Sequence, residues 1–361
     1  MTDGYRLARD VDLTTRNTFG VPARAPVLVE VDDAAALPRL FADGIVDAAD
    51  PALLVLGGGS NLLFAGDAPG PVLALTAQNV ETGDGGDDIV LVRASAGVPW
   101  HGFVMHTLSL GLCGLENLAL IPGTVGAAPI QNIGAYGVEV RERVHAVEVF
   151  ERATGKVRRL APEECGFAYR DSAFKCDPRR WIVTAVEFAL SRRPAPMLDY
   201  AGLRDELAAM DVATPTAAQV AGAVIRIRRR KLPDPAVLGN AGSFFKNPIV
   251  PASQAETLGA ANPRLPVFPV AALPADAATH GEADGDATRK LSAAWLIDAC
   301  GWKGHRDGDA GVSPDHALVL VNHGAATGSQ LLALARRITA SVHERFGVTL
   351  EPEPRIIGAD W

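Results

Sequence analysis

The stretch from Ile121 to Gly137 limits most strongly what this chain can fold into. Glycine, alanine and amide residues alternate there with aliphatic ones over the whole stretch. Small side chains let a backbone approach another group closely. Such a surface can lie flat against a planar ring and offer backbone N–H and C=O groups to its polar edge. A buried glycine-rich crossover would show the same pattern, so the residues alone leave both interpretations open.

A second glycine-rich segment, Gly57 to Asn61, directly follows the apolar residues Leu53 to Leu56. Three glycines after a strand can turn their N–H groups toward a diphosphate, although a plain loop shows the same composition. The segment is not a dinucleotide-binding fingerprint, because Leu62 stands where the last glycine would be. It is not a Walker loop either, because no Lys-Ser/Thr pair follows.

Length and composition set the broad class. A chain of 361 residues with 48% hydrophobic and 21% charged residues is typical of a globular protein of two or three domains. The net charge of −8 argues against a surface devoted to nucleic acid. No apolar run reaches about 18 residues, and the charged N-terminus lacks the core of a signal peptide, so we expect a cytoplasmic protein without a membrane span. The four cysteines show no metal or redox spacing, and no metal site is expected.

The pattern of elements predicts a mixed α and β chain. Strands are expected near 27–31, 53–56, 71–75, 89–92, 144–150 and 182–190, and helices after Asp32 or Asp33, over 98–110, after Thr214-Pro215 and after Thr327. The proline and arginine cluster at 192–196 predicts a domain boundary near 195–215. The segment from about 269 to 288 is rich in Ala, Asp, Pro and Gly without periodicity, which predicts a surface insertion.

The motifs together resemble one family. The residues Asn17 to Val21, both glycine-rich segments and Glu353-Pro354-Arg355 make the chain similar to the UDP-N-acetylenolpyruvoylglucosamine reductases, over nearly its whole length. The resemblance implies an α+β fold: a two-part FAD-binding domain of the vanillyl-alcohol-oxidase/PCMH type over 1–200, and an α+β substrate-binding domain over 215–349. Residues 350–361 would then return to the active site.

The same resemblance implies that the protein reduces UDP-N-acetylglucosamine enolpyruvate to UDP-N-acetylmuramate with NADPH and FAD. Neither glycine-rich segment contains His or Cys, so the FAD is expected to be non-covalent. The two segments supply the expected cofactor-binding residues: Gly57, Gly58, Gly59, Ser60, Asn61, Ile121, Pro122, Gly123, Thr124, Gly126, Ala127, Gln131, Asn132, Gly134, Ala135, Tyr136 and Gly137.

Three residues are expected to carry the chemistry. A lone Tyr-Arg-Asp sequence is usually a surface ion pair, but the resemblance makes Arg170 the group that holds the enolpyruvyl carboxylate, which suits a planar bidentate cation. Ser243 lacks the second glycine of a nucleophile elbow, and the resemblance makes it a proton donor. Glu353 would otherwise be a solvated strand end, and the resemblance places it in the active site opposite Arg170.

Four further residues are expected at the substrate. Lys231 and Asn247 are implied as nucleotide or sugar contacts, and Tyr200 as an aromatic that lines the cleft. Phe268 stands where relatives with a long loop often have Tyr, so it can pack but cannot donate a hydroxyl hydrogen bond. The implied partners are the UDP-sugar and NADPH, with no nucleic acid and a monomeric chain.

Two other functions fit parts of the sequence. An FAD oxidase or dehydrogenase of the same superfamily would share the flavin-side motifs, but it would need a base to take a proton from a hydroxyl and often a His or Cys linked to the flavin. A non-enzymatic nucleotide-binding module would explain the glycine turns but leave Ser243 and Glu353 without a task.

Overall fold

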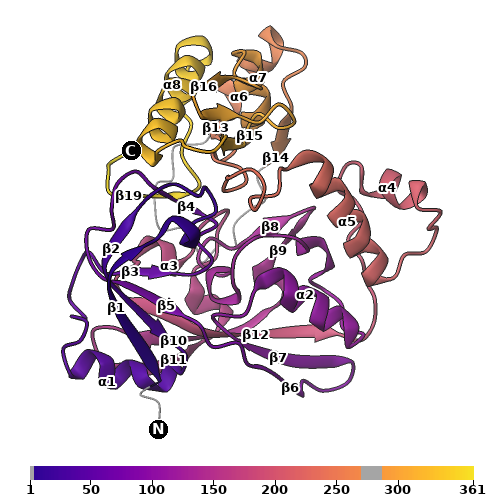
Figure 1. Ribbon diagram of the computed structural model, residues 1–361. Coiled ribbons are helices and arrows are strands. Elements are labelled where there is room, and N and C mark those ends of the chain that lie inside the picture. Colours follow the sequence, from indigo (N-terminus) through magenta and orange to yellow (C-terminus); the bar gives the residue numbers. More distant parts are fainter. Residues whose placement is uncertain (1–3, 270–286) are drawn as a thin grey trace. The chain divides into compact units, whose positions relative to one another are not determined.

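The computed structural model describes residues 4–269 and 287–361, and it divides into two compact units (Figure 1). Unit 1 consists of Met1–Leu13, Arg24–Gly59 and Ala68–Arg230. Unit 2 consists of Thr14–Ala23, Ser60–Asp67 and Lys231–Trp361. The expected insertion at 269–288 lies largely outside the described residues.

A four-stranded sheet forms the first part of unit 1. Its strands, in spatial order, are β1 (Tyr5–Asp12), β2 (Arg24–Val31), β5 (Val72–Leu75) and β3 (Leu54–Leu56). Only the β1–β2 pairing is antiparallel. Asp33 caps the short turn that leads into α1 (Leu37–Ala42), as expected, and the buried Leu37 and Leu40 pack α1 into a core that includes Phe150.

An antiparallel five-stranded sheet forms the second part. Its strands, in spatial order, are β11 (Lys156–Leu160), β10 (Val144–Glu151), β12 (Trp181–Ser191), β7 (Ile89–Ser95) and β6 (Val80–Asp84). In Figure 1, α2 (Trp100–Ser109) lies beside β12 and β7. The rings of Trp100, Phe103 and Phe188 meet there at 5.0–6.0 Å between centroids, in tilted contacts typical of an aromatic core.

The units differ from the predicted domain division. The helices α4 (Leu203–Ala209) and α5 (Ala217–Lys231) bury Leu203, Leu207 and Val224 in the same core as α2, so compactness assigns the chain up to Arg230 to unit 1. The compact units divide at Arg230, whereas the sequence predicted a boundary near 195–215. The N-terminus of α5 also differs, because Thr216 and Gln219 form the cap rather than Thr214 and Pro215.

In the residues that the structure describes, unit 2 has short strands and three α-helices. One sheet has the order β13 (Ile249–Pro251), β15 (Thr288–Leu291) and β14 (Val267–Pro269), and another has β16 (Arg306–Asp307), β17 (Ala310–Val312) and β18 (Leu320–Asn322). The helices are α6 (Ala252–Ala261), α7 (Ala293–Ala299) and α8 (Gly328–Phe346). The capping box of Thr327 with Gln330 and the left-handed Gly347 bound α8 as predicted.

Two early segments of the chain complete unit 2. The strand β4 (Leu62–Phe64) pairs in parallel with β19 (Arg355–Ile357), close to the C-terminus. A Cβ on Gly239 would lie 2.2 Å from the carbonyl oxygen of Phe19, and the amide of Asn322 donates to that same oxygen at 2.9 Å. The Asn17 to Val21 motif is therefore a packing element of unit 2, which its position in the sequence did not reveal.

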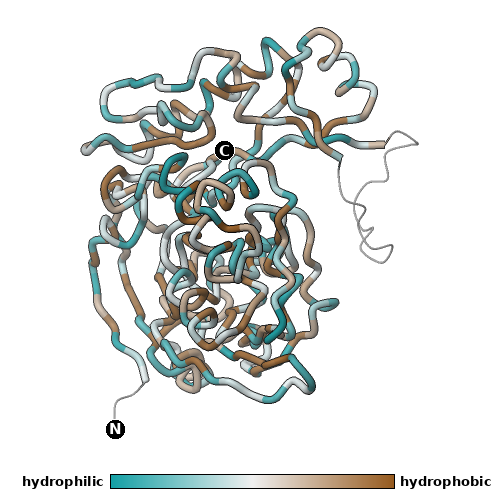
Figure 2. The backbone as a smooth tube through the Cα atoms, turned by 90° about the vertical axis from the view of Figure 1, so that its right-hand side faces the viewer, coloured by the Kyte–Doolittle hydropathy of each residue, from teal (hydrophilic) through white to brown (hydrophobic). Residues whose placement is uncertain are grey.

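Short elements complete the described chain. These are the strands β8 (Gly134–Ala135) and β9 (Val138–Glu139), the helix α3 (Ala173–Cys176), and the 3-10 turns η1 (Thr14–Arg16), η2 (Ala34–Ala36), η3 (Glu116–Leu118), η4 (Val125–Ala127), η5 (Val140–Glu142) and η6 (Pro162–Cys165). Among the described residues, none of the helices has the length and apolar character needed to span a bilayer. Figure 2 shows hydrophobic and hydrophilic residues interspersed along the chain.

Candidate active site

The two glycine-rich segments meet inside unit 1. A Cβ on Gly58 would lie 3.0 Å from the Cα atom of Gly123, and a Cβ on Gly57 would lie 2.9 Å from Oγ1 of Thr124. Both distances are tighter than ordinary Cβ contacts, so a side chain at either position would push the two segments apart or displace Thr124. The backbones at the end of β3 and at Gly123 therefore form one continuous surface.

Gly126 provides a test of this close packing. A Cβ there would lie 2.5 Å from the Cβ atom of Ala96, so we expect Gly126→Ala to displace η4 and weaken FAD binding by at least about tenfold. Fluorescence titration of apoprotein with FAD measures this. The matched control is Gly102→Ala, because Gly102 lies within α2 with no atom near its missing Cβ. Equal FAD affinity in the two variants would contradict the packing argument.

The helix α2 fixes the residues that immediately precede the Ile121 to Gly137 stretch. Trp100 is buried and donates its indole N–H to the carbonyl oxygen of Leu118 at 2.9 Å. His101 accepts a hydrogen bond at Nδ1 from the N–H of Leu120, which has the left-handed φ of 59°. Burial lowers the pKa of His101, and Arg229 and Arg228 lower it further, so the ring is neutral and remains an acceptor at neutral pH.

Asn132 joins this stretch to the loop that carries Arg170. Its side chain is fully buried and donates to the carboxylate of Glu139 at 2.9 Å and to the carbonyl oxygen of Ala168 at 3.0 Å. It also accepts from the N–H of Arg141 at 3.1 Å. The side-chain amide of Asn132, expected at the cofactor, is thus hydrogen-bonded within the protein. Any effect of Asn132 on a ligand acts through the loop that carries Arg170.

Arg170 stands in a strained and well-supported position. Its φ of 55° lies in the left-handed region, and Lys175 donates to its carbonyl oxygen at 2.9 Å. The guanidinium donates through one Nη to the carbonyl oxygen of Gly134 at 2.8 Å. A Cβ on Gly134 would lie 3.1 Å from the other Nη, so a larger residue there would crowd the guanidinium. The structure therefore brings Arg170 to the end of the Ile121 to Gly137 stretch. A strained backbone fixed by its neighbours is common at functional sites.

Arg228 is a half-buried arginine of unit 1 whose Nε is buried, and the sequence analysis missed it. Burial lowers the pKa of its guanidinium; Tyr136 raises that pKa and Arg170 lowers it, which places both residues within electrostatic reach. Its Nε makes no hydrogen bond to any part of the chain that the structure describes. A buried donor of this kind calls for an acceptor from a ligand. The cationic run from Arg228 to Lys231 was a possible signal, but it equally suits a helix C-terminus.

Tyr136 lies next to this cationic pair. Its φ is 50°, and its ring meets the ring of Tyr200 edge to face with 4.9 Å between centroids. Tyr200 is 45% exposed. The structure therefore joins the expected substrate residue Tyr200 to the expected cofactor residue Tyr136.

In unit 2, the loop before Ser243 is closed by one buried amide. Asn240 donates to the carbonyl oxygens of Pro233 and Leu238 at 3.0 and 2.8 Å, and accepts from the N–H of Gly242 at 2.9 Å. Gly242 has the left-handed φ of 69°. Ser243 follows half-buried, and its neighbour Phe244 is fully buried and donates its N–H to the carbonyl oxygen of Leu318 at 2.7 Å. The serine is therefore set on a rigid turn.

The C-terminal segment lies beside this turn within unit 2. The N–H of Glu353 donates to the carbonyl oxygen of Phe244 at 2.8 Å, and the N–H of Lys246 donates to the carbonyl oxygen of Glu351 at 3.0 Å. The side chain of Asn61 donates to the carbonyl oxygen of Glu353 at 3.2 Å. The structure thus brings Ser243 and Glu353 together, and it gives the amide of Asn61 a partner that the sequence prediction did not include.

Lys231, Asn247 and Phe268, the expected substrate contacts in unit 2, each have different neighbours. Lys231 is exposed; burial lowers the pKa of His316, and Lys231 and Lys303 lower it further, so these three residues lie near one another. His316 was missed, and no local pattern singled it out. Asn247 accepts from the N–H of Ala293 at the start of α7 at 3.0 Å. Phe268 is 42% exposed, which leaves its ring available for a ligand.

Comparisons with known proteins cover both units. Residues 30–161 match the model of an FAD binding domain, and residues 234–357 match that of the UDP-N-acetylenolpyruvoylglucosamine reductase C-terminal domain. The UDP-N-acetylenolpyruvoylglucosamine reductase of Xanthomonas axonopodis pv. citri (strain 306) is 55% identical over 358 residues, which is 99% of this chain and 98% of that protein. The chain belongs to the UDP-N-acetylenolpyruvoylglucosamine reductase family.

Other members of the reductase family agree with this assignment. The reductase of Xanthomonas euvesicatoria pv. vesicatoria (strain 85-10) is 54% identical over 99% of this chain and 98% of its own. The crystal structure of the reductase from Thermus caldophilus matches with a TM-score of 0.66 at 28% identity, over 98% of this chain and 99% of that one. The predicted resemblance and the α+β fold with an FAD-binding domain are confirmed.

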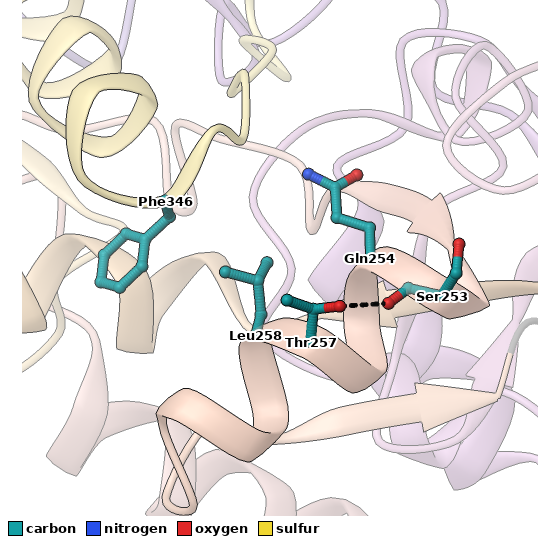
Figure 3. Close-up of a pocket in the computed structure, with 5 residues that line it drawn as sticks. All are labelled: Ser253, Gln254, Thr257, Leu258 and Phe346. Carbon is teal, nitrogen blue, oxygen red and sulfur yellow. Dashed lines mark hydrogen bonds between the residues drawn. The ribbon is translucent and has the colours of Figure 1, made fainter.

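A hollow in unit 2 is separate from the residues expected at the reductase site. It has a volume of about 390 Å³ and is lined by Ser253, Gln254, Thr257, Leu258 and Phe346, from α6 and the end of α8 (Figure 3). The hydroxyl of Thr257 donates to the carbonyl oxygen of Ser253 at 2.9 Å. The lining carries no charged side chain and none of the expected catalytic residues, so it is not a candidate for the reductase site.

Proposed function

We propose that this protein reduces the enolpyruvyl ether of UDP-N-acetylglucosamine enolpyruvate to give UDP-N-acetylmuramate, a precursor of peptidoglycan, with NADPH as the hydride donor. The observation that carries the proposal is the 55% identity to a named reductase over 99% of the chain. An FAD oxidase acting on an alcohol is disfavoured, because the matching C-terminal domain is that of the reductase family.

The residues of unit 1 fit a flavin nucleotide. Gly57 lies against Thr124 and Gly58 against Gly123, and neither glycine has a side chain to cover its N–H group, which suits a diphosphate. The buried Nε of Arg228 calls for an acceptor of the kind found on the polar edge of a flavin ring. When bound, FAD supplies hydride transfer from NADPH to the terminal methylene carbon of the enol ether. We infer non-covalent binding, because neither glycine-rich segment holds His or Cys.

Arg170 is the proposed partner of the substrate carboxylate. Hydride addition at the methylene carbon places negative charge on the neighbouring carbon and its carboxylate. The guanidinium is held in advance by the carbonyl oxygen of Gly134, and Lys175 holds the backbone of Arg170, so the charge is stabilised without reorganisation during the reaction. Its planar, permanently charged fork can grip both carboxylate oxygens.

Ser243 is the proposed proton donor to the same carbon. A serine hydroxyl is a weak acid, but an enolate-like carbanion is a strong base, and general-acid help of this kind contributes roughly 10²- to 10⁴-fold. Glu353 lies beside the serine turn through its bond to Phe244 and is proposed to orient and polarise the carboxylate. Lys231, Asn247, Tyr200 and Phe268 are the proposed contacts of the UDP-sugar.

The proposed setting is the cytoplasm, with the chain as a monomer. Its four cysteines are all free, which is typical of a reducing compartment. The proposed partners are NADPH and the UDP-sugar, and no nucleic acid.

Anaerobic titration tests the function directly. NADPH should bleach the flavin absorbance of the purified protein, and the UDP-enolpyruvyl sugar added alone should restore it. Mass spectrometry should then find a product heavier by two hydrogens. If the reduced flavin were reoxidised by a simple ketone, the oxidised form of an alcohol, but not by the UDP-sugar, the oxidase or dehydrogenase interpretation would be favoured. A purified protein without flavin would favour a nucleotide-binding module.

A further inference from the structure

Besides the buried Leu203 and Leu207, two polar contacts join the segment that carries Tyr200 to the rest of unit 1. The first is Asn117, which is 2% exposed and donates to the carbonyl oxygens of Tyr136 and Met197, each at 2.9 Å. One amide thus fixes the backbone of Tyr136 and the backbone three residues before Tyr200. This contact alone leaves Tyr200 on a segment that is held at one end only.

The second point is Glu206 on α4. Its side chain is only 5% exposed, and it accepts from Nε of Arg226 at 2.6 Å and from an Nη of Arg230. The hydrogen bond from Arg230 lowers the pKa of Glu206, so the carboxylate is ionised at neutral pH. Arg226 and Arg230 are one turn apart and therefore present the same face of α5 to the carboxylate. Hydrogen bonds to charged groups are stronger than neutral ones.

The backbone carries this anchor to Tyr200. The carbonyl oxygen of Tyr200 accepts from the N–H of Leu203 at 3.1 Å, and that of Gly202 accepts from the N–H of Glu206 at 3.1 Å. Tyr200 is therefore part of the first turn that Glu206 holds against α5. The helix α4 has seven residues, too few to be stable without such contacts.

The anchor lies next to the cationic end of α5. Arg228 stands between Arg226 and Arg230 in sequence and, at two residues from each, points away from their face. Its proximity to Tyr136 is consistent with that direction. The carboxylate of Glu206 is thus held on a face of α5 that Arg228 does not share, and of its two partners Arg230 lies within electrostatic reach of Tyr136. A change at Glu206 should consequently act on Tyr200 before it acts on the flavin.

We propose that Glu206 is a positioning residue that sets Tyr200 against Tyr136 and thereby determines how tightly the UDP-sugar is bound. The inference rests on the proposed function, because it takes the UDP-sugar as the ligand that Tyr200 contacts. It assigns Glu206 no contact with substrate or cofactor.

The test compares Glu206→Gln with Asp205→Asn, the same chemical change at the exposed neighbouring residue of α4. We expect Glu206→Gln to raise Kd of the oxidised holoenzyme for the UDP-sugar, and its KM, by about tenfold. FAD content, the rate of flavin reduction by NADPH and kcat should stay within about twofold. Asp205→Asn should match the wild type. Equal sugar affinity in both variants would overturn the inference.

A double-mutant cycle separates positioning from general damage. In a Tyr200→Ala background, Glu206→Gln should have no further effect on Kd, because both changes remove the same contact. A full additional loss would show that Glu206 acts through another group and would overturn the inference. Should Glu206→Gln fail to fold, Arg226→Met removes one exposed partner of the carboxylate and should raise Kd in the same direction by a smaller factor.

The proposed function can fail separately from this inference. If the wild type does not bind the UDP-sugar, the function is wrong. If it does and Tyr200→Ala binds equally well, the function survives and the role of Glu206 falls with that of Tyr200.

Discussion

Replacing Ser243 with alanine should separate the two halves of the reaction. NADPH should still bleach the flavin at a rate near that of the wild type, because that step needs no proton on the sugar. Reoxidation by the UDP-sugar should slow by roughly 10²- to 10⁴-fold, since hydride delivery would leave charge with no acid beside it. The reduced enzyme should therefore persist with saturating UDP-sugar, as stopped-flow absorbance under anaerobic conditions would record.

The control for this variant is Ser253→Ala, which makes the same change in the hollow on α6 and should leave both rates unchanged. The turn at Ser243 should survive the substitution, because Asn240 and Gly242 close it through backbone and amide contacts that do not involve the hydroxyl. If both half-reactions slowed together, Ser243 would be supporting the flavin site instead. If neither slowed, the proton would come from water or from Glu353.

Replacing Arg170 with lysine should lower kcat with the UDP-sugar by roughly 10²- to 10³-fold, the range seen when one preorganised donor is removed from a developing negative charge. Lysine keeps the charge but cannot offer two parallel bonds to a carboxylate. Its shorter reach also loses the bond to the carbonyl oxygen of Gly134. Steady-state kinetics measures the loss, and the FAD content should remain that of the wild type.

Arg179→Lys is the matched control, since Arg179 is an exposed arginine of the following turn. It should show wild-type kcat and KM. Near-normal turnover by Arg170→Lys would remove Arg170 from the reaction and make Arg228 the next arginine to test for the carboxylate.

Local signals predicted the elements whose ends are set by neighbouring residues. The capping box at Thr327 and the glycine at 347 bound α8, and Asp33 caps the turn before α1, because each of these interactions spans only a few residues. The N-terminus of α5 was misplaced by two residues, because Thr214-Pro215 and Thr216 with Gln219 offer rival caps close together. Such rivals differ too little in energy for sequence to rank them.

Long-range pairing decided what the sequence could not predict. Nothing near Leu62 indicates that its strand pairs with Arg355, and nothing near Arg228 indicates that its Nε is buried. The resemblance named Ser243 and Glu353, but the bond from Glu353 to Phe244, which explains their proximity, appears only in the folded chain. For Asn132 the sequence predicted a ligand contact, but its side-chain amide is hydrogen-bonded to Glu139 and Ala168 within the protein.

The pairing of β4 with β19 also bears on the order in which the two units can fold during synthesis. A ribosome makes Asn61 292 residues before Glu353, and both Asn17 to Val21 and β4 emerge long before their partners in Lys231–Trp361 exist. All strands of unit 1, which ends at Arg230, are synthesised before those of Lys231–Trp361, so unit 1 can fold during translation. A fragment starting at Lys231 would lack its parallel strand partner and the Phe19 carbonyl that receives Asn322. Unit 2 can therefore complete its β4–β19 pairing only after β19 has been synthesised.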